Sequence, residues 1–165
     1  MGLIIDWVTK PNTVLTQIAV PVFDAELHIQ YDADVIVKAS WHAAEQCVTP
    51  EPLTDWEQKI QNFLLDSHRP LRLKLLKQGS DYFHRVWNIL LNIPMGHVMT
   101  YSEVALRLDS GPRAVARACR ENPYAGIIPC HRVVAKSGLG GFMGQKEGDK
   151  VVLKAHILSQ EQRLA

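Results

Sequence analysis

Polar and apolar positions alternate early in the chain with the period of a β-strand. Residues 25–31 carry small or apolar side chains at every second position, which predicts a half-buried strand. Residues 35–39 form a β-branched run, and the polar segment 32–34 between the two runs is typical of a turn. The sequence therefore predicts a β-hairpin.

A helix is predicted after this hairpin. Thr54 is followed three residues later by Glu57, which is the spacing of a capping box, and the apolar side chains that follow share one face. The segment His68-Arg69-Pro70 ends the pattern. We expect residues 70–80 to be a linker that contains a short apolar stretch.

Helical spacing returns in the back half of the chain. Residues 83–91 carry one wide apolar stripe, and a second capping box of Thr100 and Glu103 opens a short helix. Gly111-Pro112 then forms a turn from which an arginine-rich helix follows. Two short helices joined by such a turn are typical of a helix-turn-helix. Many helical hairpins bind no nucleic acid, so the pattern alone leaves DNA binding open.

These elements predict an α+β fold in two parts. Residues 1–79 are expected to form an α/β N-terminal domain with a small antiparallel sheet and a helix. Residues 80–165 are expected to form a C-terminal domain of the winged helix-turn-helix type. A chain of 165 residues is long enough for two small domains that each bury a core.

Charge is distributed unevenly between the two halves. Residues 1–84 hold 7 Lys/Arg and 11 Asp/Glu, whereas residues 85–165 hold 11 Lys/Arg and 6 Asp/Glu. A polyanion would therefore meet the back half, although ordinary scatter of surface charge explains the same counts. No apolar run approaches the roughly 18 residues that span a bilayer, and no signal peptide is evident, so we expect a cytoplasmic protein without a membrane partner.

The three cysteines are Cys47, Cys119 and Cys130. Their odd number and their spacing argue against disulfides, and no C-x-x-C or H-x-x-x-H pattern predicts zinc, so we expect no metal site. His131 directly follows Cys130, and an adjacent imidazole can lower the pKa of a thiol toward neutrality. A buried structural cysteine beside a surface histidine is the other interpretation of this pair.

The segments around Cys130 resemble those of the methylated-DNA–protein-cysteine methyltransferases, or O6-alkylguanine-DNA alkyltransferases. Order and spacing agree over roughly residues 80–156, about half of the chain, and the front half agrees only in general layout. The segments that carry the resemblance are FHRVW at 83–87, IPMG at 93–96, TYSEVA at 100–105, RAV at 113–115, NP at 122–123, IPCHRVV at 128–134, glycines at 138, 140 and 141, and Lys150.

The resemblance implies a repair protein that acts once. Cys130 would accept the alkyl group of an O6-alkylguanine, or of an O4-alkylthymine, in duplex DNA without a cofactor. His131 would deprotonate Cys130 through a bound water. Glu161 is the carboxylate nearest in the sequence to the position from which the family holds this histidine. The residues implied to bind the base are Tyr101, Cys119, Asn122, Val133, Phe142 and Met143. The residues implied to contact DNA are Thr100, Ser102, Arg113, Ala114, Arg117 and Arg120.

The resemblance also implies how the damaged base is reached. Arg113 would fill the space that the extruded guanine leaves, from a recognition helix lying in the minor groove. Tyr101 would hydrogen-bond the base and assist its flipping, while the backbone carbonyls of Cys130 and Val133 would read its amino group. The loop 140–144 would wall the pocket, with the Met143 backbone near the guanine oxygen. Asn122 would orient the recognition helix against the active-site loop. A monomer would suffice.

The chain departs from the family pattern at three places. The family has a glutamate 27 residues after the cysteine, where this chain has Ile157, although Lys150, Leu153 and His156 stand at the family's positions. Ala116-Arg117 occupies a place where smaller residues let the family's helix approach the groove. Residues 141–147 replace a glycine-richer loop that contains a tyrosine.

Two other functions are therefore compatible with the sequence. An alkyltransferase-like lesion sensor would turn the base out without accepting its alkyl group. Ile157 in place of the family's glutamate favours that function, whereas Cys130 argues against it because such sensors carry another residue there. A transcription regulator would use the helix-turn-helix and carry Cys130 incidentally.

Overall fold

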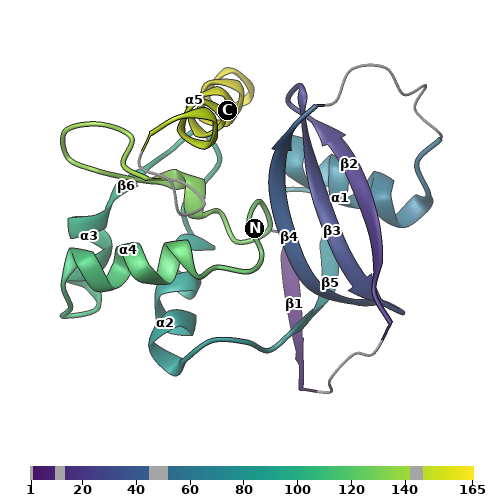
Figure 1. The fold of residues 1–165 in the computed structure, drawn as a ribbon, viewed down its shortest axis with the longest axis horizontal. Helices are drawn as coiled ribbons and strands as arrows, with labels where there is room; N and C mark the ends of the chain where they lie inside the picture. Colours follow the sequence, from purple (N-terminus) through teal and green to yellow (C-terminus); the bar gives the residue numbers. More distant parts are fainter. Residues whose placement is uncertain (1, 10–13, 45–51, 142–146) are drawn as a thin grey trace. The chain divides into compact units, whose positions relative to one another are not determined.

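The computed structural model describes residues 2–9, 14–44, 52–141 and 147–165. The chain divides into two compact units, Met1–Lys77 and Gln78–Ala165, each of which is described by itself (Figure 1). The division falls two residues before the boundary that the sequence predicts.

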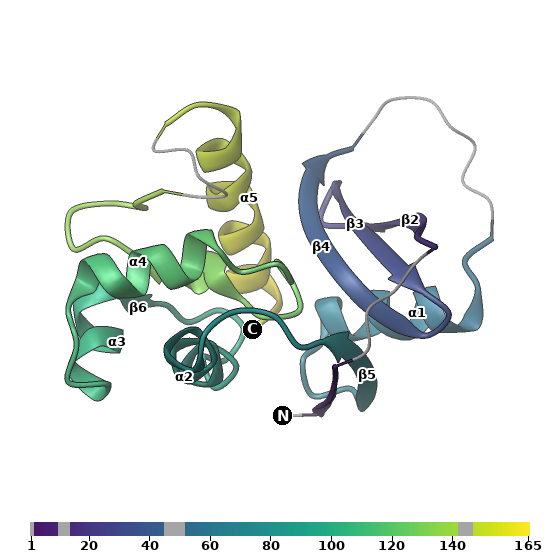
Figure 2. The same cartoon turned by 60° about the horizontal axis from the view of Figure 1, so that its bottom comes forward.

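The first unit is a five-stranded mixed sheet with one helix. The strands are β1 (Leu3–Val8), β2 (Thr16–Val22), β3 (Ala25–Asp32), β4 (Val35–Ala43) and β5 (Leu71–Leu76), in the order β1-β5-β4-β3-β2. Strands β2, β3 and β4 pair antiparallel, while β5 pairs parallel with both β1 and β4. Helix α1 (Asp55–Leu65) lies along one face of the sheet (Figure 2).

Local sequence signals explain much of this unit. The predicted hairpin is present as β3 and β4, joined by Ala33-Asp34, and Leu27, Ile29 and Trp41 bury their side chains in the core. Helix α1 begins at the predicted capping box, in which the Thr54 hydroxyl accepts a hydrogen bond from the Glu57 amide.

The expectation of a linker at residues 70–80 is wrong. Leu71–Leu76 is a strand inside the sheet, with Leu71, Leu73 and Leu75 buried and the side chains between them directed outward. The expected small antiparallel sheet is present as β2, β3 and β4, and β5 extends it with parallel pairs into a mixed sheet. The alternating leucines of β5 show a period of two, which is the signal of a strand with one buried face.

The second unit is mainly helical. It contains α2 (Asp81–Leu90), β6 (Met99–Thr100), α3 (Tyr101–Arg107), α4 (Pro112–Arg120), the 3-10 turn η1 (Cys130–Arg132), β7 (Val133–Val134) and α5 (Asp149–Leu164). Helices α3 and α4 form the predicted helix-turn-helix, with the Thr100–Glu103 capping box at the start of α3 and Pro112 at the start of α4. The segment before Cys130 is a loop with one isolated bridge, between Ala125 and Ile128. Among the described helices, none is long and apolar enough to cross a membrane.

Helix α5 contributes both apolar and polar side chains to the interior of the second unit. Leu153 and Ile157 are buried, and Ile157 is 0% exposed. Lys154 and Glu161 are buried on the same helix. Lys154, Ile157 and Glu161 are spaced by three and four residues, which places them on one face.

We predict that Ile157→Glu destabilises the protein. The new carboxylate would be buried one turn from the anion Glu161, while the ammonium group of Lys154 is already bonded to backbone carbonyls, so we expect a loss of about 3 kcal/mol or more in the free energy of unfolding. Urea denaturation measures the loss. The control Val152→Glu lies on the same helix at a side chain 69% exposed, where we expect a change within about 0.5 kcal/mol. Equal stability of the two variants would contradict this assignment of the helix faces.

Candidate active site

Cys130 begins the η1 turn that follows the loop after α4. The Cys130 amide donates to the carbonyl of Ile128 at 2.8 Å, and the Arg132 amide donates to the carbonyl of Pro129 at 3.0 Å. Strand β7 directly after the turn pairs in parallel with β6, so that Thr100 stands opposite Val134. Because Thr100 caps α3, this pairing brings the start of the helix-turn-helix beside the cysteine.

The Cys130 side chain is buried, with 7% of its surface exposed. Burial raises the pKa of the Cys130 thiol because the thiolate is poorly solvated there. A hydrogen bond from the Asn122 side chain, the charge of Lys154 and nearby backbone amides act in the opposite direction. The resting protein therefore holds the sulfur as a thiol, with groups beside it that favour the thiolate.

A buried carboxylate binds the two residues that follow Cys130. Glu161 Oε1 lies 2.7 Å from His131 Nε2, and both Glu161 oxygens accept hydrogen bonds of 2.9 Å from the Arg132 guanidinium. Arg132 Nη1 also donates to the carbonyl of Ile93 at 2.8 Å. Glu161 is only 2% exposed, yet the charges and hydrogen bonds of His131 and Arg132 overcome the cost of burial and lower its pKa to about 2.

The carboxylate beside His131 comes from Glu161, one helical turn beyond Ile157. The interval from Cys130 to this carboxylate is 31 residues, four more than the family spacing used in the sequence comparison. The buried lysine of α5 is Lys154, four residues after Lys150.

Asn122 joins the end of α4 to the loop that carries Cys130. Its side-chain amide donates to the carbonyl of Ile128 at 2.9 Å, and its side-chain oxygen accepts from the Tyr124 amide at 2.9 Å. Its own amide donates to the carbonyl of Cys119, near the end of α4. Asn122 thus connects the helix to the loop, through its backbone amide on one side and its side chain on the other.

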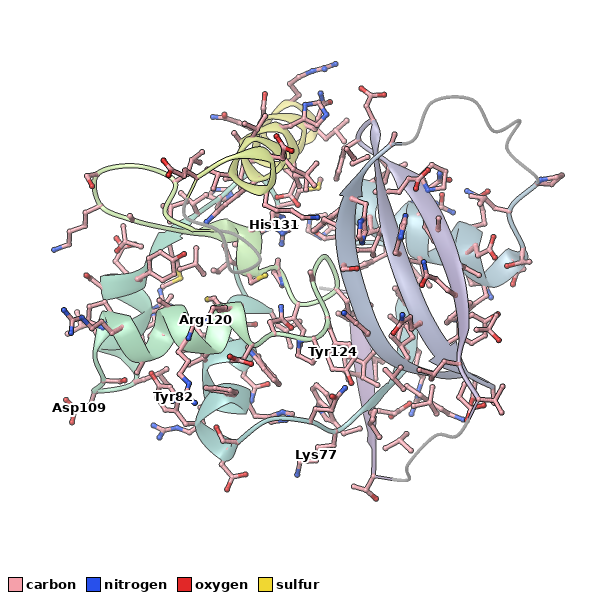
Figure 3. All side chains as sticks on the ribbon, viewed as in Figure 1. Lys77, Tyr82, Asp109, Arg120, Tyr124 and His131 are labelled. Carbon is pink, nitrogen blue, oxygen red and sulfur yellow. The ribbon has the colours of Figure 1, made fainter. Side chains whose placement is uncertain are left out.

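Helix α2 holds the helix-turn-helix from behind. Trp87 Nε1 donates to the carbonyl of Ala118 on α4 at 2.9 Å, and the hydroxyls of Tyr82 and Ser110 lie 2.6 Å apart at the turn. Figure 3 shows Tyr82 and Asp109 on this side of the unit and His131 on η1 near α5. Both ends of α4 are therefore tied to other elements of the unit.

The outer side of α4 is basic. The three arginines predicted to contact DNA, Arg113, Arg117 and Arg120, are exposed, and their spacings of four and three residues place them on one stripe. Ala114 is exposed beside Arg113. Thr100 and Ser102 are partly exposed at the start of α3, and the Thr100 hydroxyl is used as the helix cap.

Tyr101 lies with the two described cysteines and the pocket loop. Burial, reinforced by the charges of Cys119 and Cys130, raises the pKa of Tyr101 well above its usual value. Gly140 has a φ of +72°, and a Cβ atom there would stand 2.9 Å from Cε2 of the Tyr101 ring. A glycine at position 140 therefore allows the loop to lie directly against the tyrosine.

Not every predicted site residue can be placed. Val133 is buried in β7, and Cys119 is a partly buried free thiol. Phe142 and Met143 lie outside the described residues, as do Gly144 and Cys47. Within the described ranges, no group of three His, Cys, Asp or Glu side chains is arranged to hold a metal ion.

Sequence reasoning assigned no role to Arg132 or Lys154, although the structure places both inside the unit. Arg132 is bonded to the carboxylate that reaches His131, and Lys154 is 0% exposed. A signal was present for Lys154. It stands three residues before Ile157 and seven before Glu161, on a helix face that is otherwise directed inward.

The second unit combines a helix-turn-helix, packed on a third helix, with a buried Cys-His-Glu arrangement. This combination defines a DNA-binding domain that carries a reactive cysteine. Residues 81–163 match the model of the family described as 6-O-methylguanine DNA methyltransferase, DNA binding domain. This chain belongs to that family.

Named relatives agree with this membership. The chain is 34% identical over 109 residues to a methylated-DNA–protein-cysteine methyltransferase of Archaeoglobus fulgidus, covering 66% of this chain and 74% of the relative. It is 34% identical over 108 residues to the protein of that name from Thermococcus barophilus, covering 63% of this chain and 62% of the relative. With several further relatives the match spans about half of the relative's length.

The fold also resembles that of solved structures. The crystal structure of Mycobacterium tuberculosis OGT in complex with DNA superposes with a TM-score of 0.66 at 29% identity. The match covers 89% of this chain and 92% of that chain. The similarity therefore extends over both units and is not confined to the helix-turn-helix.

We predict that Glu161 makes stability sensitive to acid. Its pKa lies near 2 in the folded protein and near the ordinary 4.5 in the unfolded chain, so its contribution is fully present above pH 4.5 and is lost as the pH falls toward 2. The difference corresponds to a contribution on the order of 3 kcal/mol. Urea unfolding at a series of pH values measures it.

The variant Glu161→Gln tests the source of this acid sensitivity. We expect it to be less stable at pH 7, because Arg132 loses its buried anion, and to lack the part of the slope between pH 4.5 and 2 that Glu161 supplies. The exposed Glu121→Gln serves as the control. An unchanged slope in Glu161→Gln would show that other carboxylates cause the acid sensitivity.

Proposed function

We propose that this protein repairs alkylated DNA by moving the alkyl group of an O6-alkylguanine onto Cys130, where it stays. The observation that carries the proposal is the buried contact between His131 and Glu161. His131 directly follows Cys130, and Asn122 connects the loop before Cys130 to the end of α4. The family membership supports the same reaction. The relatives named above are called methylated-DNA–protein-cysteine methyltransferases.

The residues support a direct displacement. The Cys130 sulfur attacks the alkyl carbon, the bond between that carbon and guanine O6 breaks, and a thioether forms. Guanine leaves with the electron pair and takes up a proton. The proton of the thiol passes to His131 through a water molecule. The carboxylate of Glu161 can only accept a hydrogen bond at Nε2, so Nδ1 is the basic nitrogen of a neutral His131.

Glu161 serves the reaction by holding His131 and by stabilising the imidazolium that forms. A carboxylate with a pKa near 2 stays ionised at neutral pH, so its charge is present when the proton arrives. Arg132 holds the same carboxylate through a bidentate contact and keeps it from turning away. Since the thioether does not hydrolyse readily, each protein molecule acts once.

Duplex DNA is the proposed partner. An O6-alkyl group lies within the base stack, so the base must turn out before the sulfur can reach it, at a cost of a few kcal/mol. Arg113 would occupy the space that the base leaves, and Arg117 and Arg120 would contact phosphates of the duplex. The basic stripe of these three exposed side chains supports this assignment.

One copy of the chain is sufficient for the proposed reaction. Cys130, His131, Glu161 and Asn122 all belong to the second unit of a single chain. We therefore propose a monomer. The expectation of a cytoplasmic location stays a prediction.

We predict that duplex DNA containing one O6-methylguanine adds one methyl group, about 14 Da, to the peptide that contains Cys130. Intact-mass and peptide mass spectrometry measure the addition. Cys130→Ser is expected to bind the same DNA without gaining mass, and Cys119→Ser is expected to gain it. Tight lesion binding with no gain of mass in the unaltered protein would instead indicate a lesion sensor. Binding to one sequence without preference for the lesion would indicate a regulator.

We predict separate effects for the arginines of α4. Arg117→Ala and Arg120→Ala each remove one phosphate contact, so the slope of log affinity against log salt concentration falls by about one in each variant. Arg113→Ala is expected to lower the rate of transfer at saturating DNA more than it lowers affinity, because it acts on the flipped state. The exposed Arg163→Ala on α5 is the control. Identical salt slopes in all four proteins would contradict the placement of DNA on α4.

A further inference from the structure

A short loop leads from the end of α4 to the turn that carries Cys130, and Tyr124 lies at its base. The Ile128 amide donates to the Tyr124 carbonyl at 2.8 Å, and Gly126 between them has a φ of +83°, which lets the chain reverse. The Cys130 amide in turn donates to the Ile128 carbonyl. The backbone of Tyr124 is therefore connected to that of Cys130 through two hydrogen bonds.

The proposed reaction assigns no role to the Tyr124 side chain. This side chain is 0% exposed, and its hydroxyl accepts a hydrogen bond of 3.0 Å from the side-chain amide of Gln78. Figure 3 labels Tyr124 in the loop between α4 and η1. Burial raises the pKa of Tyr124 to about 12, so the hydroxyl keeps its proton near neutral pH and the contact with Gln78 does not change there.

Gln78 is itself fixed to α2. Its backbone carbonyl accepts a hydrogen bond of 2.7 Å from Nε2 of His84. A Cβ atom on the neighbouring Gly79 would stand 2.7 Å from the Trp87 ring, so this segment packs directly against the helix. Because these contacts use the backbone of residues 78 and 79, a change of the Gln78 side chain leaves them in place.

The loop before Cys130 is therefore held from two sides. On one side, the Asn122 side chain bonds the Ile128 carbonyl and the Tyr124 amide, which attaches the loop to the end of α4. On the other side, the Tyr124 hydroxyl attaches the loop through Gln78 to α2. A loop attached to one helix can pivot, whereas attachment to two helices sets the position of its backbone.

We propose that Tyr124 is a positioning residue whose hydroxyl, held by Gln78, sets the place of the Cys130 sulfur. The inference rests on the proposed function, since a direct displacement needs the sulfur aligned with the alkyl carbon at about 3–3.5 Å. Tyr124 acts through the backbone of Ile128 and Cys130. Its loss would lower the rate of transfer without weakening the contact of α4 with DNA.

The test measures single-turnover transfer from duplex DNA containing O6-methylguanine. Tyr124→Phe keeps the buried ring and removes only the hydroxyl. We expect the rate at saturating DNA to fall about fivefold, the size expected for one hydrogen bond, while the DNA concentration that gives half of this rate changes less than about twofold. Gln78→Met has a side chain of similar length that cannot donate, and we expect the same loss.

A double-mutant cycle tests whether the two side chains act on one another. We expect the variant with both Tyr124→Phe and Gln78→Met to lose about fivefold as well, because each change breaks the same hydrogen bond. Tyr31→Phe is the matched control, since it removes a hydroxyl from a partly exposed tyrosine of the first unit. An unchanged rate in Tyr124→Phe would overturn the proposal, as would losses that multiply in the double variant or an equal loss in Tyr31→Phe.

Hydrogen exchange gives a second measurement, which does not need DNA. We expect the amides of Ile128 and Cys130 to exchange about fivefold faster in Tyr124→Phe, while the amide of Val104, buried on α3, keeps its rate. Unchanged exchange at both loop amides would overturn the proposal. An equal increase at Val104 would also overturn it, because the hydroxyl would then stabilise the unit as a whole. Where Tyr124→Phe does not fold, Gln78→Met is measured in its place and decides.

The two measurements separate this inference from the proposed function. Failure of the unaltered protein to gain a methyl group would overturn the proposed function, and exchange at Ile128 and Cys130 would still decide whether Tyr124 fixes the loop. A normal rate of transfer in a Tyr124→Phe protein whose loop amides exchange faster would remove Tyr124 from the reaction and leave the proposed function standing.

Discussion

The arrangement of the second unit depends on one buried carboxylate. Glu161 gives up its hydration and is stabilised by the charge of Arg132 and by hydrogen bonds from His131 and Arg132. Such an anion is costly to move, since any displacement leaves Arg132 or the carboxylate buried without a partner. Helix α5 and the η1 turn are therefore held in one relative position, and Cys130, at the start of that turn, is held with them.

A second set of contacts carries this fixed position to the helix-turn-helix. Asn122 bonds the loop before Cys130 to the end of α4, and Trp87 bonds α4 to α2. Arg132 also reaches the carbonyl of Ile93, in the segment after α2. Short hydrogen bonds thus connect α4 to the turn that carries the Cys130 sulfur. In the proposed repair reaction, a base turned out at α4 would meet a sulfur whose distance from that helix is already set.

Elements specified by their own residues could be predicted, and those specified by distant partners could not. The capping boxes at Thr54 and Thr100 fixed helix starts because each cap is satisfied within four residues. Strand β5 was missed because its pairing partners lie far away in the sequence, although its alternating leucines indicated a strand. The carboxylate partner of His131 could be named from the sequence only as a candidate, Glu161, because the family's position holds Ile157 and spacing along a chain does not reveal which carboxylate reaches a buried imidazole. The contact in the structure identifies Glu161 as this carboxylate.

Groups around Cys130 both raise and lower the pKa of its thiol. Their balance explains how a thiol that the proposed reaction uses once can stay unreacted until then. Burial disfavours the thiolate, which protects the sulfur from small electrophiles before DNA arrives. The Asn122 hydrogen bond and the Lys154 charge favour the thiolate and are already in place, so they require no rearrangement when the proton leaves. His131, which Glu161 holds in place, then needs to remove only one proton at the moment of reaction. The same low polarity that holds the resting thiol neutral makes the attraction between the Cys130 thiolate and the Lys154 ammonium stronger than it would be in water.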